Sequence, residues 1–170
     1  MDLRIREGGS DDVPAILALL DGAVEWLVAV GRTRQWGTRP WSASENAVRT
    51  VTGYAATGTP YLAELDGVPV GTLTLTDGPG PYLAAAAEPE RYVHLLAADH
   101  RHAGHGIGAA LLAHAARETR RAGVGLLRVD CYAGDDGKLV AFYERNGFER
   151  TEAFTVGEDR WPGQVLARRV

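Results

Sequence analysis

The chain has 170 residues, of which 45% are apolar and 24% charged, and its formal net charge is −4. These values are typical of a globular protein with a substantial core, so we expect one domain over residues 1–170. The acidic balance argues against nucleic-acid binding, and the one cysteine, Cys131, excludes an internal disulfide framework and a cysteine-rich zinc site.

The first elements predicted are a strand and a helix. Residues 3–8 alternate in hydropathy as a short strand does. Ser10 and Asp11 are residue types that cap helix N-termini, and apolar residues at helical spacing follow them. We therefore expect a helix that starts here, continues or resumes after Ala23 and ends at Gly31.

A second helix and a β-hairpin are expected next. Residues 42–45 read Ser-Ala-Ser-Glu, the spacing of a capping box, and predict a helix that starts there and reaches Ala56. Asp-Gly at 66–67 separates the apolar runs 61–65 and 68–75. Asp-Gly is a strong two-residue turn signal, so these runs predict a β-hairpin.

The second half of the chain alternates strands and helices. Apolar runs and helical spacing predict strands over 92–98, 126–132, 149–156 and 163–169, and helices over 106–122 and 137–146. Gly147 is suited to the left-handed position after a helix, and the segment Thr76–Pro89 is expected to be mobile. The element order β-α-α-β-β-β-α-β-α-β-β predicts an α/β (α+β) fold with a mixed sheet and helices on both faces.

A glycine-rich turn joins the strand 92–98 to the helix 106–122. Residues 104–108 read Gly-His-Gly-Ile-Gly. Because glycine has no Cβ, such a turn can direct its N–H groups at a ligand, and the helix N-terminus adds further N–H groups at the same place. The pattern predicts a pyrophosphate site. A tight turn without a ligand is the alternative.

Two segments about 40 residues apart carry a resemblance to a known family. Ala103-Gly104-His105-Gly106-Ile107-Gly108 and Phe142-Tyr143-Glu144-Arg145-Asn146-Gly147-Phe148, in this element order, resemble the GCN5-related N-acetyltransferase (GNAT) family over nearly the whole chain. The resemblance implies acetyl-CoA as acyl donor, no metal, and direct attack by a primary amine in a ternary complex.

The resemblance implies a set of residues that bind acetyl-CoA. They are Leu96, Ala97, Ala98, Ala103, Gly104, His105, Gly106, Ile107, Gly108, Lys138 and Tyr143. The family pattern has Gln or Arg where this chain has Ala103, so one side-chain contribution is missing. Arg101 or His102 can compensate, or both are solvated loop residues.

Tyr143 and His94 are the catalytic candidates. Tyr143 stands where the family places its general acid, and a phenol is protonated at pH 7. His94 stands on the strand where some family members carry a histidine, and it suits removal of a proton from the amine. In a strand, residues 92, 94, 96 and 98 share one face. Packing roles for both side chains are the alternatives.

The resemblance implies that the first two helices and their connection form much of the acceptor pocket. There Glu25, Trp26 and Trp36 are the candidate substrate-binding residues, because tryptophan faces and a carboxylate suit a protonated amine. Anchoring of the helices is the alternative for the two tryptophans. The histidines at 100, 102, 105 and 114 lack metal-ligand spacing.

The leading hypothesis is a small-molecule N-acetyltransferase. Acetylation of a protein N-terminus or lysine, and a non-catalytic acyl-CoA-binding module, are the alternatives. The sequence argues against a nucleoside triphosphatase, because no Gly-Lys-Ser/Thr follows the glycines. No secretory signal or membrane span is visible, so we expect a cytoplasmic protein without membrane or nucleic-acid partners, and leave homodimer formation open.

Overall fold

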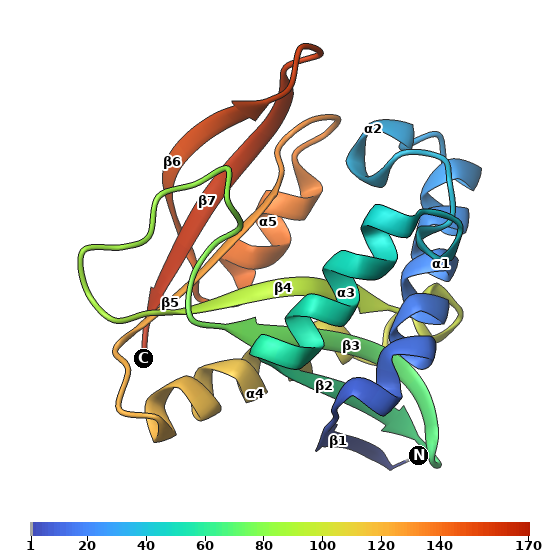
Figure 1. Cartoon of the computed structure of the whole chain (residues 1–170), viewed down its shortest axis with the longest axis horizontal. Helices are drawn as coiled ribbons and strands as arrows, with labels where there is room; N and C mark the ends of the chain where they lie inside the picture. Colours follow the sequence, from blue (N-terminus) through green and yellow to red (C-terminus); the bar gives the residue numbers. More distant parts are fainter. Residues whose placement is uncertain (1) are drawn as a thin grey trace. The chain divides into compact units, whose positions relative to one another are not determined.

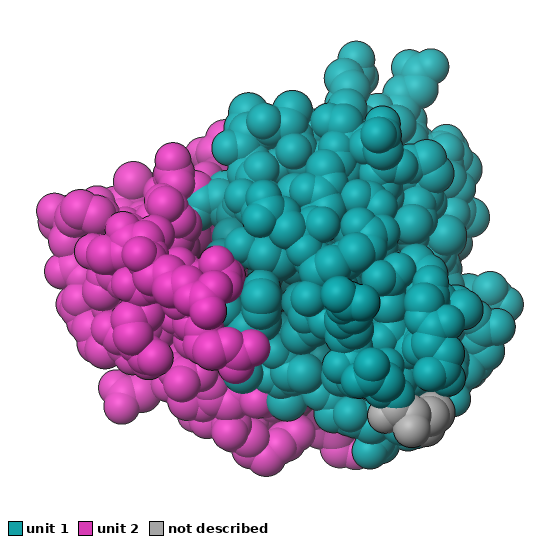
Figure 2. All heavy atoms as spheres, turned by 90° about the horizontal axis from the view of Figure 1, so that it is seen from below, with its two compact units in different colours: residues 1–76, 94–114 teal, residues 77–93, 115–170 magenta. Residues whose placement is uncertain are grey.

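The structure is a computed structural model that describes residues 2–170, and these fall into two compact units (Figure 2). Unit 1 runs to Thr76 and resumes over His94–His114, and unit 2 takes Asp77–Val93 and Ala115–Val170. The single domain expected over residues 1–170 stays a prediction. None of the helices in residues 2–170 has both the length and the apolar character needed to cross a membrane.

Seven strands form one mixed sheet (Figure 1). Its strand order is β1-β2-β3-β4-β5-β7-β6. Strands β4 and β5 pair in parallel, whereas β1 with β2, β2 with β3, β5 with β7 and β6 with β7 pair antiparallel. The strands are β1 (Leu3–Glu7), β2 (Thr59–Leu65), β3 (Val68–Thr76), β4 (Arg91–Ala98), β5 (Leu126–Tyr132), β6 (Glu149–Val156) and β7 (Trp161–Arg169).

The described helices follow the predicted order with one short addition. They are α1 (Val13–Ala29), α2 (Thr33–Trp36), α3 (Glu45–Thr57), α4 (Ile107–Arg121) and α5 (Lys138–Arg145), with 3₁₀ turns at Ser10–Asp12, Trp41–Ala43 and His100–His102. The four-residue α2 was not predicted, because one helical turn is too short to show a periodic pattern.

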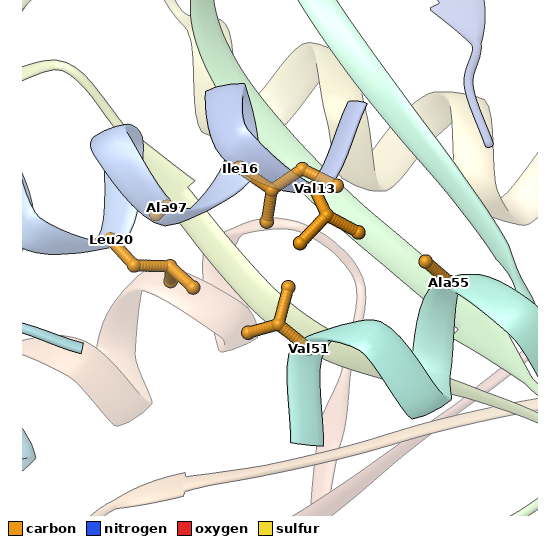
Figure 3. Packing of buried hydrophobic residues seen from close by; sticks show 6 residues of the cluster. All are labelled: Val13, Ile16, Leu20, Val51, Ala55 and Ala97. Carbon is orange, nitrogen blue, oxygen red and sulfur yellow. The ribbon is translucent and has the colours of Figure 1, made fainter. Parts of the chain in front are cut away.

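In unit 1, α1 and α3 pack through a small apolar cluster (Figure 3). Its buried members are Val13, Ile16 and Leu20 from α1, Val51 and Ala55 from α3, and Ala97 from β4. The spacing of three and four residues within α1 places its members on one helix face. This spacing explains why α1 was predictable from the sequence.

Helix α4 reaches the sheet at Gly71 of β3. A Cβ at Gly71 would stand 2.5 Å from Ile107 Cγ2 and 3.1 Å from Leu111 Cδ1, so only glycine permits this approach. Figure 1 shows α1 and α3 in front of β2 and β3, whereas α4 passes behind these strands. Helices therefore cover both faces of the sheet, as predicted.

Both predicted helix starts were wrong in detail. Ser10 lies in a 3₁₀ turn, and α1 begins after Asp12, whose carboxylate accepts the Gly9 N–H and pairs with Arg6 at 2.8 Å. The predicted capping box at 42–45 is absent because a 3₁₀ turn occupies Trp41–Ala43.

Helix α3 is instead capped two residues later than predicted. Ser44 Oγ accepts the N–H of Ala47 at 3.3 Å. Ser42 Oγ donates to Asp21 of α1 at 2.5 Å, so this hydroxyl ties the connection to the first helix. The sequence could not show that contact because the two residues lie 21 positions apart.

The β-hairpin and the end of α5 confirm their predicted turns. Asp66 and Gly67 both have positive φ, 51° and 82°, as a type I′ turn requires. Gly147 has φ 88°, and the N–H groups of Gly147 and Phe148 donate to the carbonyls of Glu144 and Tyr143. This pair of hydrogen bonds is the Schellman ending of a helix.

In unit 2, the segment between β3 and β4 is tied down by ion pairs. Arg128 of β5 pairs with Glu90 at 2.7 Å in a buried position and also donates to the carbonyl of Ala84. Glu88 pairs with Arg169 of β7. The mobility expected of this segment stays a prediction, and these contacts oppose it.

Candidate active site

The glycine-rich turn of unit 1 has the conformation that its glycines predict. Gly104 and Gly106 have φ of 87° and 66°, in the left-handed region that favours glycine. A Cβ at either position would meet no other atom within 4 Å. Space for a ligand is therefore open beside both residues, and Gly106 provides the first carbonyl of α4, which accepts the Ala110 N–H at 2.9 Å.

Five backbone N–H groups at this turn form no hydrogen bond within residues 2–170. They belong to Gly104, Gly106, Ile107, Gly108 and Ala109. The first N–H groups of a helix always lack an intrahelical partner, and here two positive-φ glycines add to them. Together with the positive end of the α4 dipole, these donors suit a pyrophosphate.

Arg101 and His102, the candidates to compensate for the missing side chain at position 103, both lie beside Asp99. Ala103 is exposed. Arg101 is engaged with Asp99, which accepts from its Nη2 at 2.7 Å and from its backbone N–H at 3.0 Å. The Arg101 guanidinium lowers the pKa of Asp99 to about 2, since it donates hydrogen bonds to the charged carboxylate. His102 Nδ1 lies 3.8 Å from the same carboxylate.

Strand β4 departs from the strict alternation that was expected. Leu95 has φ 57°, a left-handed conformation that a leucine adopts rarely. The expected shared face of residues 92, 94, 96 and 98 is therefore wrong, because the extended pleat is interrupted between His94 and Leu96. Leu96 and Ala98 are half-buried, and Ala97 is buried in the cluster with α1 and α3.

His94 is a buried side chain with defined neighbours in unit 1. Its Nε2 lies 2.9 Å from Thr76 Oγ1, and its ring stacks on Tyr54 with centroids 4.2 Å apart. The residue as a whole is 7% exposed. A histidine held in this way has a fixed orientation, which a catalytic base needs, and the catalytic role stays a prediction.

Tyr143 lies in unit 2 with its ring enclosed and its hydroxyl available. Phe142 and Phe148 meet the ring edge-on, at centroid distances of 5.3 Å and 5.8 Å. Within residues 2–170 the Tyr143 hydroxyl forms no hydrogen bond. Burial raises its pKa, and Cys131 and Asp130 raise it further, so the phenol keeps its proton at neutral pH.

Lys138 and Cys131, both in unit 2, differ sharply in exposure. Lys138 is exposed at the start of α5, where its backbone N–H donates to Asp136 Oδ1 and its Nζ lies 3.6 Å from Asp136 Oδ2. Cys131 is buried, and burial raises the pKa of its thiol to about 12. A thiol in this state is not a nucleophile at neutral pH.

The structure separates the three predicted acceptor residues into two groups within unit 1. Trp26 stacks on His100, with centroids 6.1 Å apart. Asp99 raises the pKa of Arg101, and the charge of Glu25 adds a smaller contribution in the same direction. Trp36 instead meets Trp41 edge-on at 5.8 Å, and both line a surface hollow of about 440 Å³. Glu25 and Trp26 thus lie near His100 and Arg101, just before the glycine turn, whereas Trp36 lines a separate hollow.

Sequence reasoning missed one polar and aromatic group in unit 2. Tyr82 and Tyr92 both donate hydrogen bonds to the carboxylate of Asp130, and Tyr82 stacks on Phe154. The residues come from a loop and three strands, so no local pattern could reveal the group. We call these residues together with Trp161 the Asp130 cluster.

The comparisons with known proteins agree with the fold described above. The Acetyltransferase (GNAT) family profile matches residues 30–148. The chain belongs to the GNAT acetyltransferase family. It is an acetyl-CoA-dependent acyltransferase of this family.

One relative and two solved structures are similar over most of this GNAT chain. The uncharacterized N-acetyltransferase YesJ of Bacillus subtilis (strain 168) is 28% identical, and the match covers 92% of this chain and 87% of YesJ. The ribosomal-protein-S18-alanine N-acetyltransferase of Escherichia coli is 18% identical, with TM-score 0.71 and coverage of 99% and 94%. The acetyltransferase yncA of Salmonella typhimurium, solved with acetyl-CoA, is 18% identical, with TM-score 0.69 and coverage of 98% and 93%.

Proposed function

We propose that this chain transfers the acetyl group of acetyl-CoA directly to the amine of a small-molecule acceptor while both substrates are bound. The observation that carries the proposal is the glycine turn, where five N–H groups without partners meet the N-terminus of α4. A pyrophosphate needs such an array of donors and the absence of nearby Cβ atoms, and both conditions are met at Gly104 and Gly106.

The residues present fit acetyl-CoA. The N–H groups of Gly104 and Gly106 to Ala109 would hold its pyrophosphate, and the backbone of Leu96, Ala97 and Ala98 would align its pantetheine arm. The thioester supplies an activated acetyl group with a sulfur leaving group. Arg101 is engaged with Asp99, so backbone donors rather than this side chain would carry the phosphate contacts.

Tyr143 would stabilise the charge that develops on the leaving sulfur. An ordinary phenol has a pKa about 1.5 units above that of a thiol near 8.5, and burial raises the pKa of Tyr143 further. Full transfer of the proton to the sulfur would therefore cost more than about 2 kcal/mol. Donation of a hydrogen bond without loss of the proton is the role that this side chain suits best.

His94 would accept a proton from the attacking amine. Because an ammonium cannot attack a carbonyl, one proton must leave before the nitrogen acts as a nucleophile. Neutral imidazole suits this step, and Nε2 of His94 already has a hydrogen-bonding neighbour, Thr76 Oγ1 at 2.9 Å. Thr76 can relay or orient that proton, depending on the histidine tautomer.

A panel of amines tests the proposal. The purified protein is incubated with acetyl-CoA and single amines, the release of free thiol is followed, and products are identified by mass spectrometry. We expect turnover with at least one small primary amine and a mass gain of one acetyl group. Acetylation of peptides alone would favour a protein acceptor, and binding of acetyl-CoA without any turnover would favour a non-catalytic module. The cytoplasmic location stays a prediction.

A further inference from the structure

Asp130 of β5 is held by two tyrosine hydroxyls. Tyr92 donates to Oδ2 at 2.6 Å, and the Tyr82 hydroxyl lies 3.1 Å from both carboxylate oxygens. Tyr92 is buried, and burial together with the adjacent Asp130 raises its pKa. Both hydroxyls donate to Asp130, and they orient the carboxylate without neutralising it.

No cationic side chain within residues 2–170 pairs with Asp130. By contrast, Glu90, the buried carboxylate of the same unit, pairs with Arg128 at 2.7 Å. Arg128 lies two positions before Asp130 on the same strand and on the same face. Its guanidinium is nevertheless bound to Glu90 and to the Ala84 carbonyl, so Asp130 has no ion-pair partner among the described residues.

Aromatic rings lie in a row beginning at Asp130. The Tyr82 ring stacks on Phe154 with centroids 5.8 Å apart, and Phe154 lies 6.4 Å from Trp161. Tyr82 is 48% exposed, and Phe154 and Trp161 are half-buried. Ring surface is therefore accessible beside the carboxylate.

The row of rings depends on a glycine in β7. A Cβ at Gly163 would stand 2.2 Å from Phe154 Cζ, so the Phe154 ring lies directly across the backbone of β7. Gly163 is paired with both Phe154 of β6 and Tyr132 of β5, which places this ring on the face that carries Tyr132 and Asp130. The backbone thus fixes the aromatic rings relative to the anion.

We infer that the Asp130 cluster binds the ammonium group and apolar body of the acceptor, a compact primary amine with an aromatic or aliphatic side. A carboxylate without a counterion attracts an ammonium, and ring faces bind both cations and apolar groups. The cluster offers a polycation only one anion, so its other ammonium groups would lie against apolar ring surface without a counterion. Naming the ligand as the acceptor rests on the proposed function, whereas the binding site itself does not.

Direct binding of two matched probes tests the inference without acetyl-CoA. Phenethylamine is cationic at pH 7.5, and 2-phenylethanol has nearly the same shape without the charge. Titration calorimetry or chemical shifts should give at least tenfold tighter binding of the amine. Asp130→Asn should abolish this preference, and Trp161→Leu should weaken both probes at least threefold and keep the preference.

Glu149→Gln is the matched control. It removes an exposed carboxylate at the other end of β6, five residues and about 17 Å along the strand from Phe154, and it should leave both affinities unchanged. Near-UV circular dichroism verifies the fold of each variant. If Asp130→Asn does not fold, the amine-to-alcohol ratio of the unaltered protein and of Trp161→Leu decides the question.

Three outcomes would overturn the inference. They are equal affinity for the two probes, a preference that survives in folded Asp130→Asn, and tighter binding of spermidine than of phenethylamine. A separate titration with acetyl-CoA keeps the two proposals apart. Amine preference without acetyl-CoA binding would refute the proposed function alone, and acetyl-CoA binding without amine preference would refute this inference alone.

Discussion

Substitution of Gly106 by alanine should change both the acetyl-CoA affinity and the free energy of unfolding, and the two effects have different causes. Gly106 has φ 66°, and an alanine in the left-handed region costs about 1–2 kcal/mol. No protein atom lies within 4 Å of the added methyl group, so the strain is the whole expected loss in the free energy of unfolding. The methyl group would instead stand beside the N–H groups proposed to bind the pyrophosphate, and we expect at least tenfold weaker acetyl-CoA binding.

Gly123 provides the matched control at the other end of α4. It has φ 76°, and a Cβ there also meets nothing within 4 Å. Gly123→Ala should therefore lose the same 1–2 kcal/mol, approximately, in urea unfolding and retain its acetyl-CoA affinity in calorimetry. Equal affinities in the two variants would refute the assignment of the turn to the pyrophosphate. A much larger stability loss in Gly106→Ala would show that the turn has a structural role that we have overlooked.

Three other predictions concern catalysis, acid stability and the buried ion pair. Tyr143→Phe should lower kcat about a hundredfold and leave the KM for acetyl-CoA unchanged in steady-state kinetics. The pKa of Asp99 is lowered in the folded state, so its contribution to stability is complete above about pH 4 and lost as the pH falls towards 2; Asp99→Asn should flatten this part of the unfolding profile. Glu90→Gln leaves the buried Arg128 charge without its partner and should cost about 3–5 kcal/mol in urea unfolding.

Each of these has its own control. Tyr61→Phe removes a hydroxyl from another buried tyrosine, and a similar loss of kcat there would exclude a specific role for Tyr143. Arg101→Met should flatten the acid profile as Asp99→Asn does, and an unchanged profile would contradict the ion-pair explanation. Glu144→Gln breaks the exposed pair with Arg150 and should cost less than about 1 kcal/mol; a cost equal to that of Glu90→Gln would contradict the role of burial.

Features fixed by a few neighbouring residues could be predicted from the sequence. Asp66-Gly67 determines a tight hairpin because both residues adopt positive φ at little cost. Gly147 ends α5 for the same reason, and Gly104 and Gly106 allow the turn before α4. In each case the conformational preference of the residue and its local hydrogen bonds decide the structure, and no distant contact competes with them.

Features that depend on distant contacts could not be predicted. Ser42 has the right spacing for a helix cap, yet its hydroxyl finds the Asp21 carboxylate 21 residues away. Tyr82 reaches Asp130 across 48 residues, so the sequence showed only a loop tyrosine and an isolated acid. Leu95 takes a positive φ that its residue type disfavours, which means that tertiary packing rather than local preference sets its conformation.

Alkylation of the single cysteine, Cys131, can be used to follow unfolding. Burial raises the pKa of the Cys131 thiol to about 12, so almost none of it is thiolate at pH 7.5 in the folded protein. Alkylating reagents that need the thiolate will modify the chain only when β5 opens. Timed alkylation followed by mass measurement therefore gives the opening rate of the strand that carries Asp130, with no label to introduce and no second cysteine to remove.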